Sequence, residues 1–278
     1  MVDLHTHSSA SDGLLTPREL VHYAGSLGVR ALALTDHDTV AGLPEAQEAA
    51  TDFDVRIIPG IELEADYDLG ALHVLGLGLR HLDEELEASL RELREARTRR
   101  NLGMIARLSE LGIAVNYAEV AGYAGGGVVG RPHFAQLLTE RGIAASYQDA
   151  FDRFLADGAA AHEPRSAPSI ARCIHIIHAA GGTAVVAHPR TLWLSSWRKV
   201  TDALTRWKQV GLDGIEAYYA GAAPAVAAHY AEIARRLDLL VTAGSDYHGR
   251  WGRPGRTGVG MEIDDTFAAP FLESAVRG

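Results

Sequence analysis

The sequence predicts an α/β fold in which strands alternate with helices and a long helical stretch interrupts the alternation once. Three observations support this prediction. Short apolar runs of strand length alternate with amphipathic helical stretches. Most of these runs end in histidine, aspartate or glutamate. The alternation stops near residue 81 and resumes near residue 166, so the length of 278 residues suits one α/β barrel with an inserted piece.

The first half of the predicted barrel has four strands. They cover residues 1–7, 31–35, 55–61 and 71–79. The helix after the first strand begins with a capping box formed by Thr16 and Glu19 and ends at Gly28. A second helix is expected over residues 43–50. The run 31–35 is apolar throughout, which is typical of a strand buried on both faces.

The second half repeats this order. Strands are expected over residues 183–187, 214–219 and 239–243, and helices over residues 168–180, 197–210 and 224–237. An arginine- and glycine-rich loop, 250–260, precedes a last short strand and helix. Alternating strands and helices predict a parallel sheet with crossover helices. The carboxyl ends of such strands gather at one edge, where sites are built.

The interruption predicts a separate helical unit. We expect residues 1–80 and 166–278 to form the barrel and residues 81–165 to form a helical insertion. Helices are predicted over residues 83–111, 117–123, 131–141 and 147–155. The first is polar, with many glutamate–arginine spacings of three or four. Its arginines are therefore expected mostly on a solvated face; they are Arg91, Arg94, Arg97, Arg99 and Arg100.

Composition narrows the class of protein. The net charge of −10 argues against a surface for duplex nucleic acid. No apolar run is long enough to span a membrane and no leader is evident, which predicts a cytoplasmic protein. Cys173 is the only cysteine and lies in an apolar helical stretch, so it is interpreted as a buried structural thiol. Lys199 and Lys208 are the only lysines.

Metal-binding residue types recur at the strand ends. His5 and His7 lie one residue apart on a strand and therefore point to the same face, and Asp246 and His248 repeat this spacing. The full set of candidate ligands is His5, His7, Asp12, His37, Glu62, His73, His188, Asp246 and His248. Nine ligands are too many for one ion, so two or three divalent metals are expected, with Glu62 as a suitable bridge.

One of these residues alone would not indicate a metal site, because a lone histidine near a strand end is more often a hydrogen-bonded core or surface residue. The histidines in predicted helices are given no site role; they are His22, His175, His178 and His229. Asp36 and Asp38 flank His37, and two roles stay open for them: capping the loop, or contacting a ligand imidazole or the substrate. Glu216 is expected to support the site or the fold rather than to bind metal.

A further group suits anions. Arg131 and His133 follow a glycine-rich loop at the start of a predicted helix, and Arg165 follows Pro164 near the end of the insertion. Helix N-termini and arginines both favour phosphate. The alternative is that these are surface residues without a role.

In order, spacing and type, these motifs resemble the polymerase-and-histidinol-phosphatase (PHP) family. The motifs are Asp3-Leu4-His5-Thr6-His7, Ser11-Asp12-Gly13, Thr35-Asp36-His37-Asp38, Gly60-Ile61-Glu62, His73, Ala187-His188-Pro189 and Gly244-Ser245-Asp246-Tyr247-His248-Gly249. Gly130-Arg131-Pro132-His133 and the insertion are similar to stand-alone bacterial PHP phosphoesterases, which act on nucleoside 3′,5′-bisphosphates and, in some members, on the 5′ ends of short RNA. The chain departs from that group near the exit of the insertion, where it has His162 and Ser166-Ala167.

The resemblance implies a distorted (β/α)7 barrel with a trinuclear metal centre. It assigns His5, His7, Glu62 and Asp246 to one metal, Glu62, His73 and His188 to a second, and Asp12, His37 and His248 to a third. It also implies that Arg131, His133 and Arg165 face the substrate phosphates, and Asp38, beside His37, is a further candidate for contacting the substrate.

The expected activity is metal-dependent hydrolysis of a phosphate ester. A hydroxide bridging two metals is the expected nucleophile, with no separate nucleophilic side chain. The substrate is a small phosphorylated compound, a nucleotide or short oligonucleotide. Histidine and carboxylate ligands fit manganese, with iron or zinc as alternatives.

Three other functions stay open. A histidinol-phosphate-type phosphatase would keep the chemistry and change the substrate. An amidohydrolase would need a bridging lysine, for which no strand end offers a candidate. A non-catalytic metal-binding platform would bind metal without turnover.

Overall fold

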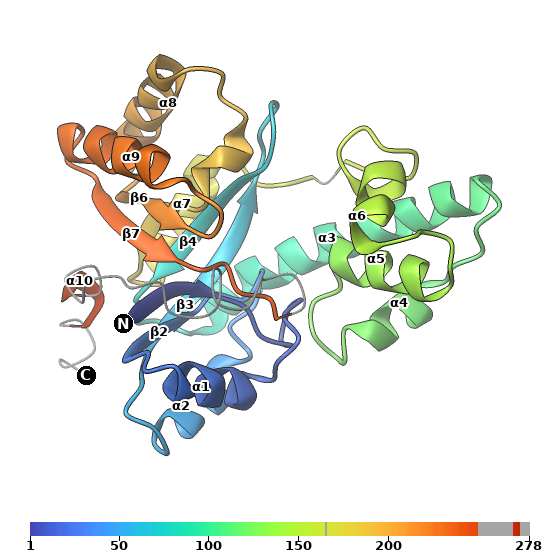
Figure 1. Ribbon diagram of the computed structural model, residues 1–278, viewed down its shortest axis with the longest axis horizontal. Coiled ribbons are helices and arrows are strands. Elements are labelled where there is room, and N and C mark those ends of the chain that lie inside the picture. Colours follow the sequence, from blue (N-terminus) through green and yellow to red (C-terminus); the bar gives the residue numbers. More distant parts are fainter. Residues whose placement is uncertain (165, 250–268, 273–278) are drawn as a thin grey trace.

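Seven strands form one sheet in which each strand lies beside its sequence neighbours (Figure 1). The computed structural model describes residues 1–164, 166–249 and 269–272. The strands are β1 (Val2–Thr6), β2 (Ala31–Leu34), β3 (Arg56–Ala65), β4 (Leu72–Leu77), β5 (Thr183–Val186), β6 (Gly214–Tyr219) and β7 (Leu240–Gly244). The sheet curls until the chain after β7 meets β1, where the His7 N–H donates to Tyr247 O and the Asp246 N–H donates to His5 O, both at 2.9 Å. The expected distorted seven-stranded barrel is confirmed.

One strand departs from the parallel arrangement. β4 pairs antiparallel with both β3 and β5, whereas the other neighbouring pairs within the sheet are parallel. The expectation of a parallel sheet throughout is therefore wrong at β4. A parallel crossover needs a dozen or more residues, but only residues 66–71 join β3 to β4, so the chain turns back as a hairpin. This reversal puts His73, at the start of β4, opposite Glu64 near the end of β3.

Helices cover the outside of the barrel (Figure 1). They are α1 (Pro17–Ser26), α2 (Leu43–Ala50), α7 (Ile170–Ala179), α8 (Trp197–Gln209) and α9 (Pro224–Arg236). The predicted capping box at Thr16 and Glu19 is present at the start of α1. Cys173 on α7 is fully buried, as expected. The predicted loop 250–260 and last strand lie outside the described residues, which include the short helix α10 (Ala269–Leu272).

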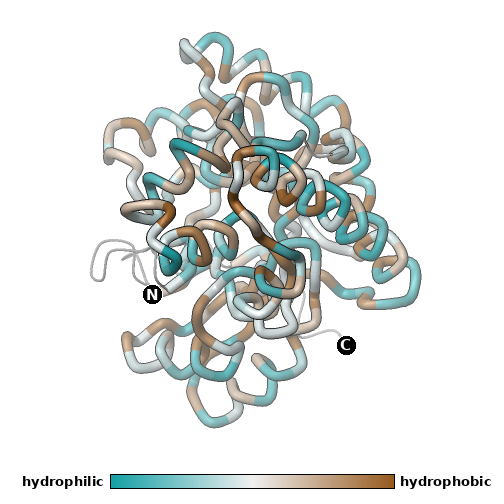
Figure 2. Tube along the Cα trace, turned by 90° about the vertical axis from the view of Figure 1, so that its right-hand side faces the viewer, coloured by the Kyte–Doolittle hydropathy of each residue, from teal (hydrophilic) through white to brown (hydrophobic). Residues whose placement is uncertain are grey.

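The stretch between β4 and α7 is helical: Leu86, Leu90 and Leu93 pack into the barrel core, and from Met104 onward the stretch has a core of its own. Its elements are α3 (Glu84–Glu110), α4 (Tyr117–Tyr123), α5 (Arg131–Glu140), α6 (Tyr147–Ala150) and the π-helical turn η1 (Phe151–Leu155). Met104, Phe134 and Leu138 are fully buried within this core. Figure 1 shows these helices beside the barrel, and Figure 2 views the molecule from their side, with hydrophilic and hydrophobic residues mixed along each helix. No helix in the described residues combines the length and hydropathy needed to cross a membrane.

Candidate metal centre

All nine predicted ligands meet at one rim of the barrel. They come from β1 and the loop after it (His5, His7, Asp12), the end of β2 (His37), β3 (Glu62), the start of β4 (His73), the end of β5 (His188) and the loop after β7 (Asp246, His248). Glu62 lies within its strand, because β3 continues to Ala65 in its ladder with β4 instead of ending at residue 61. The antiparallel direction of β4 brings His73 to the same rim although it begins its strand.

The first group of ligand atoms belongs to His5, His7, Glu62 and Asp246. The Nε2 atoms of His5 and His7 lie 3.1 Å apart. Glu62 Oε2 lies 3.4 and 3.2 Å from these two nitrogens, and Asp246 Oδ1 lies 3.2 and 3.3 Å from them. Atoms at such separations surround a centre about 2 Å from each, which is the length of a bond from a divalent transition metal to nitrogen or oxygen.

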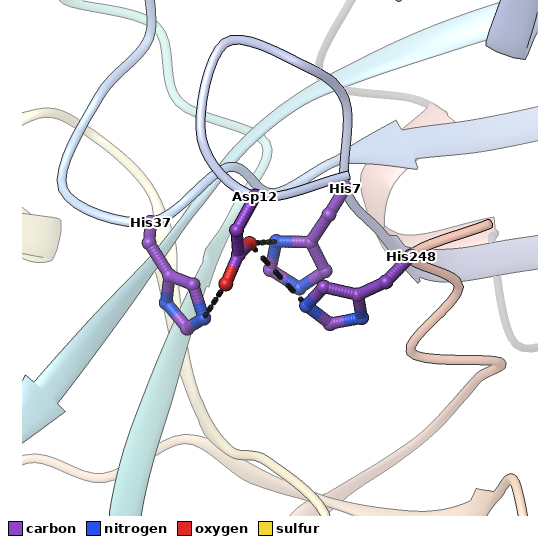
Figure 3. Close-up of side chains that lie close together, drawn as sticks. All are labelled: His7, Asp12, His37 and His248. Atoms are coloured by element: carbon purple, nitrogen blue, oxygen red, sulfur yellow. Dashed lines mark ion pairs between the residues drawn. The ribbon is translucent and has the colours of Figure 1, made fainter. Parts of the chain in front are cut away.

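The second group consists of His7, Asp12, His37 and His248 (Figure 3). Asp12 Oδ1 lies 3.9 Å from His7 Nδ1 and 3.4 Å from His248 Nε2, and Asp12 Oδ2 lies 3.9 Å from His37 Nε2. The family resemblance implies that Asp12, His37 and His248 share one metal. The structure adds His7, whose two ring nitrogens face the two groups.

Glu62 joins these groups to a third. Its Oε1 lies 2.9 Å from His73 Nδ1 and 3.1 Å from His188 Nε2. Its Oε2 lies 3.2 Å from His37 Nδ1. The side chain is 1% exposed. A buried carboxylate with each oxygen directed at different imidazoles is placed to bridge ions.

The chemistry of the donor set fits cations. Buried polar atoms normally form hydrogen bonds, yet His7 Nδ1, His37 Nδ1 and Asp246 Oδ1 form none of good geometry with the residues that the structure describes, although other ligand atoms lie close to them. Burial lowers the pKa of His37 to about 3, so its imidazole is neutral and offers a lone pair. Burial also lowers the pKa of His7, but Asp246 and Glu62 outweigh it and raise this pKa to about 10. The carboxylates therefore favour a positive charge at this position, which a metal ion would supply.

Buried carboxylates next to the cluster hold the ligands in place. Glu216 on β6 lies 3.1 Å from His5 Nδ1 and accepts a bond of 2.7 Å from the His188 N–H. This contact turns His5 Nε2 toward the cluster. Asp36 accepts bonds of 2.8 and 2.7 Å from the N–H and hydroxyl of Ser8. Glu216 therefore positions two ligand residues, and Asp36 caps the loop that follows β1.

Arginines from the insertion face a cleft of 520 Å³ beside the cluster. Arg97 and Arg100 on α3 and Arg131 at the start of α5 line it. Arg97 and Arg100 are only 6% and 5% exposed, so the prediction of a solvated face is wrong for these two. The reason is that α3 packs against the barrel, where Arg97 Nε and Nη2 lie 2.9 and 2.7 Å from Asp38 Oδ2. The spacing of three in Arg94, Arg97 and Arg100 puts these residues on one face of the helix but does not show that this face is buried.

The residues expected to face the substrate have different surroundings. Arg131 lines the cleft. Asp38 is buried and contacts Arg97. His133 is 6% exposed, and its Nδ1 accepts a bond of 2.9 Å from the backbone N–H three residues earlier. Arg165 lies outside the described residues.

The barrel side of the cleft includes residues that sequence reasoning missed. Three of them follow β5, and the fourth is the last residue of β6; they are Arg190, Thr191, Trp193 and Tyr219. The first two belong to a 3-10 turn, η2 (Pro189–Leu192), directly after the ligand His188. No periodicity in this segment marks it as part of a site.

Neither lysine reaches the cluster. Lys199 and Lys208 lie on α8, where their Nζ atoms bond to Ser195 Oγ at 3.0 Å and to the carbonyl oxygen of Leu237. The bridging lysine required by the amidohydrolase alternative is therefore missing from the cluster as far as the structure describes the chain.

A barrel with such a rim is the architecture of a metal-binding hydrolase, and known proteins share it. The family model of the PHP domain matches residues 3–156. A 5′-3′ exoribonuclease of Haemophilus influenzae is 36% identical over 247 residues, which cover 88% of this chain and 89% of the relative. A 3′,5′-nucleoside bisphosphate phosphatase of Chromobacterium violaceum is 31% identical over 268 residues, covering 91% and 89%.

Solved structures agree with these relatives. A metal-dependent phosphoesterase of Bifidobacterium adolescentis superposes with a TM-score of 0.85 at 32% identity, over 98% of this chain and 96% of that one. The chain belongs to the PHP family, and the resemblance seen in its sequence is confirmed.

Proposed function

We propose that the cleft hydrolyses phosphate esters of nucleotides, namely nucleoside 3′,5′-bisphosphates and the 5′ ends of short RNA. The chain is a metal-dependent phosphoesterase, the class expected from its sequence, and its relatives are named for nucleotide and RNA substrates. The observation that carries the proposal is a set of ligand groups joined by Glu62 beside a cleft lined with arginines. Divalent ions and guanidinium groups both stabilise negative charge on phosphate.

The metal assignment is part of the proposal. One divalent ion is held by His5, His7, Glu62 and Asp246, a second by Glu62, His73 and His188, and a third by Asp12, His37 and His248. Nitrogen and carboxylate donors without thiolate suit manganese, with iron or zinc as alternatives. When bound, such ions lower the pKa of coordinated water and neutralise phosphate oxygens.

The side chains around the metals position the phosphate. Arg97 and Arg100 bring fixed positive charge to the cleft, and Arg131 adds a third guanidinium. Burial lowers the pKa of Arg97, but Asp38 and other carboxylates raise it above its usual value, so the group stays charged. A guanidinium already held by Asp38 needs little reorganisation when an anion binds. His133 accepts a backbone N–H at Nδ1, so its hydrogen is on Nε2.

We also infer a division of labour between two parts of the chain. Residues 1–80 and 166–278 form the barrel that holds the metals, and residues 81–165 form an insertion that supplies substrate-binding side chains. Two features support this division. From Met104 onward the insertion has a hydrophobic core distinct from that of the barrel, whereas the first half of α3 packs into the barrel core. Three of the arginines that line the cleft come from α3 and α5.

The proposal is tested by measuring phosphate release from adenosine 3′,5′-bisphosphate with added manganese. His5→Ala and Asp246→Asn are expected to lower kcat/KM at least about 100-fold, because each removes a ligand of one ion. His22→Ala is the matched control, since His22 is exposed on α1 away from the cluster. Metal content is measured in parallel by mass spectrometry.

Each outcome has a separate meaning. Equal rates in the wild type and both ligand variants would overturn the assignment of the site. Turnover of histidinol phosphate, but of no nucleotide, would support the phosphatase alternative. Bound metal without turnover of any phosphate ester would support a non-catalytic platform.

A further inference from the structure

Trp193 is an exposed aromatic residue inside the cleft. It follows η2 on the barrel side, and its side chain lines the same cleft as the metal cluster. The residue is 67% exposed, although most tryptophans are largely buried. The exposed indole presents a flat π surface and an N–H donor at the rim of the charged cleft.

The backbone at Trp193 is held in an unusual conformation. Its φ of 49° lies in the left-handed region, which bulky residues rarely adopt. Such strain persists only where the surroundings enforce it, and it gathers at functional sites. Here the Trp193 N–H donates to Arg190 O at 3.2 Å and closes the turn.

The β3–β4 hairpin loop supports the turn from one side. The Ala71 N–H donates to Thr191 O at 3.0 Å, and the Thr191 hydroxyl donates to Ala71 O at 2.8 Å. Gly70 packs so closely that a side-chain carbon there would lie 2.2 Å from Thr191 O and 3.2 Å from the Trp193 ring. The indole is thus braced by the hairpin and is a fixed platform.

The same turn connects this platform to the metal cluster. His188, which contacts Glu62, begins the turn, and its Nδ1 lies 3.1 Å from the Thr191 hydroxyl. Arginines line the insertion side of the cleft, whereas Trp193 and Arg190 line the barrel side. A ligand with its phosphate at the metals and arginines would therefore extend its other end toward the indole.

We propose that Trp193 stacks against the nucleobase of the substrate and selects nucleotides over phosphate esters without a base. The inference rests on the proposed function of the cleft and names what its second end recognises. Every base has a π-face, so one indole accepts different bases, and a stacked base adds about 5- to 150-fold in affinity. The neighbouring Arg190 and Thr191 are polar, which fits the edge of a base rather than an apolar protein surface.

A binding experiment tests the platform without turnover. Metal-loaded protein is mixed rapidly with adenosine 3′,5′-bisphosphate and, separately, with inorganic pyrophosphate, and tryptophan fluorescence is recorded before turnover. The nucleotide is expected to quench the emission and pyrophosphate to leave it unchanged. In Trp193→Ala the quenching is lost, whereas in Trp197→Ala it remains, because Trp197 packs on His229 and Tyr230 of α9.

A kinetic experiment tests selectivity with metal added. The ratio of kcat/KM for adenosine 3′,5′-bisphosphate to that for ribose 5-phosphate is expected to fall about 5- to 150-fold in Trp193→Ala. Trp193→Phe restores most of the ratio, since a phenyl ring also stacks. An unchanged ratio, or quenching that survives in Trp193→Ala, would overturn the stacking role. Quenching by nucleotide without hydrolysis of either ester would contradict the proposed function but keep the platform.

Discussion

The barrel and the insertion bring charged side chains to the same cleft by different physical routes. The barrel presents histidines and carboxylates from the ends of strands, which share one rim. The insertion presents arginines from the face of α3, and their position depends on how that helix packs. A strand-end residue is therefore placed by chain topology, whereas a helical residue is placed by tertiary packing.

The two sides also differ in how firmly their groups are held. The two carboxylate oxygens of Glu62 contact three histidines, which are His73, His188 and His37. On the insertion side, Arg97 depends mainly on the carboxylate of Asp38. Substitutions on the barrel side are therefore expected to lower metal content and catalytic rate together. Substitutions on the insertion side are expected to weaken substrate binding while the metal stays bound.

The largest effect is expected for Glu62→Gln. The amide keeps the size of the side chain but loses the negative charge shared by the ligand groups, so metal content and kcat should fall together. We expect kcat/KM to drop at least about 1,000-fold on adenosine 3′,5′-bisphosphate. Rates and metal content by mass spectrometry are measured on the same samples.

Glu48→Gln is the matched control, because Glu48 is exposed on α2. It should change neither quantity. If Glu62→Gln kept its metals and its activity, the carboxylate would not be the link between the ligand groups. The expectation that barrel-side residues hold the metals and insertion-side residues hold the substrate would then fail.

The barrel side could be predicted from sequence because its signals are local. Alternate spacing in His5 and His7 fixes a common face whatever the rest of the chain does. Topology limited the prediction at β4, where the short link after β3 reverses the strand. His73 still reaches the rim because the beginning of an antiparallel strand lies beside the ends of its neighbours.

Arg97→Met is expected to have the next largest effect and to separate the two sides. The variant keeps a long, unbranched side chain but replaces the charged guanidinium donor in the cleft with an apolar end. A charge-assisted hydrogen bond contributes about 1.5–3 kcal/mol, so KM should rise about 10- to 100-fold, with metal content unchanged. Steady-state kinetics with added manganese measure this change.

Arg99→Met provides the comparison, since Arg99 lies on the same helix and is exposed. Its KM should match the wild type. Loss of metal in Arg97→Met would show that the insertion also stabilises the cluster and would contradict the proposed division of labour.

The insertion side could be predicted only as helices. The glutamate–arginine spacings of α3 are equally compatible with any face turned to water. The face that contains Arg97 and Arg100 is buried because Asp38 and Glu64 of the barrel lie against it, with carboxylate–guanidinium distances of 2.7 to 4.0 Å. These partners are far apart in sequence, so no local pattern identifies them.

The smallest effect is expected for Asp38→Asn, which tests how the barrel positions an insertion residue. Asparagine tolerates the left-handed backbone of Asp38, whose φ is 53°, so the loop should keep its shape. Its amide can still accept a bond from Arg97 but offers no charge. KM should rise about 5- to 10-fold, less than in Arg97→Met, with kcat within about twofold. Asp54→Asn, at an exposed position, is the control. If the effects of Asp38→Asn and Arg97→Met add fully in the double variant, Asp38 acts independently; non-additive effects show that it acts through Arg97.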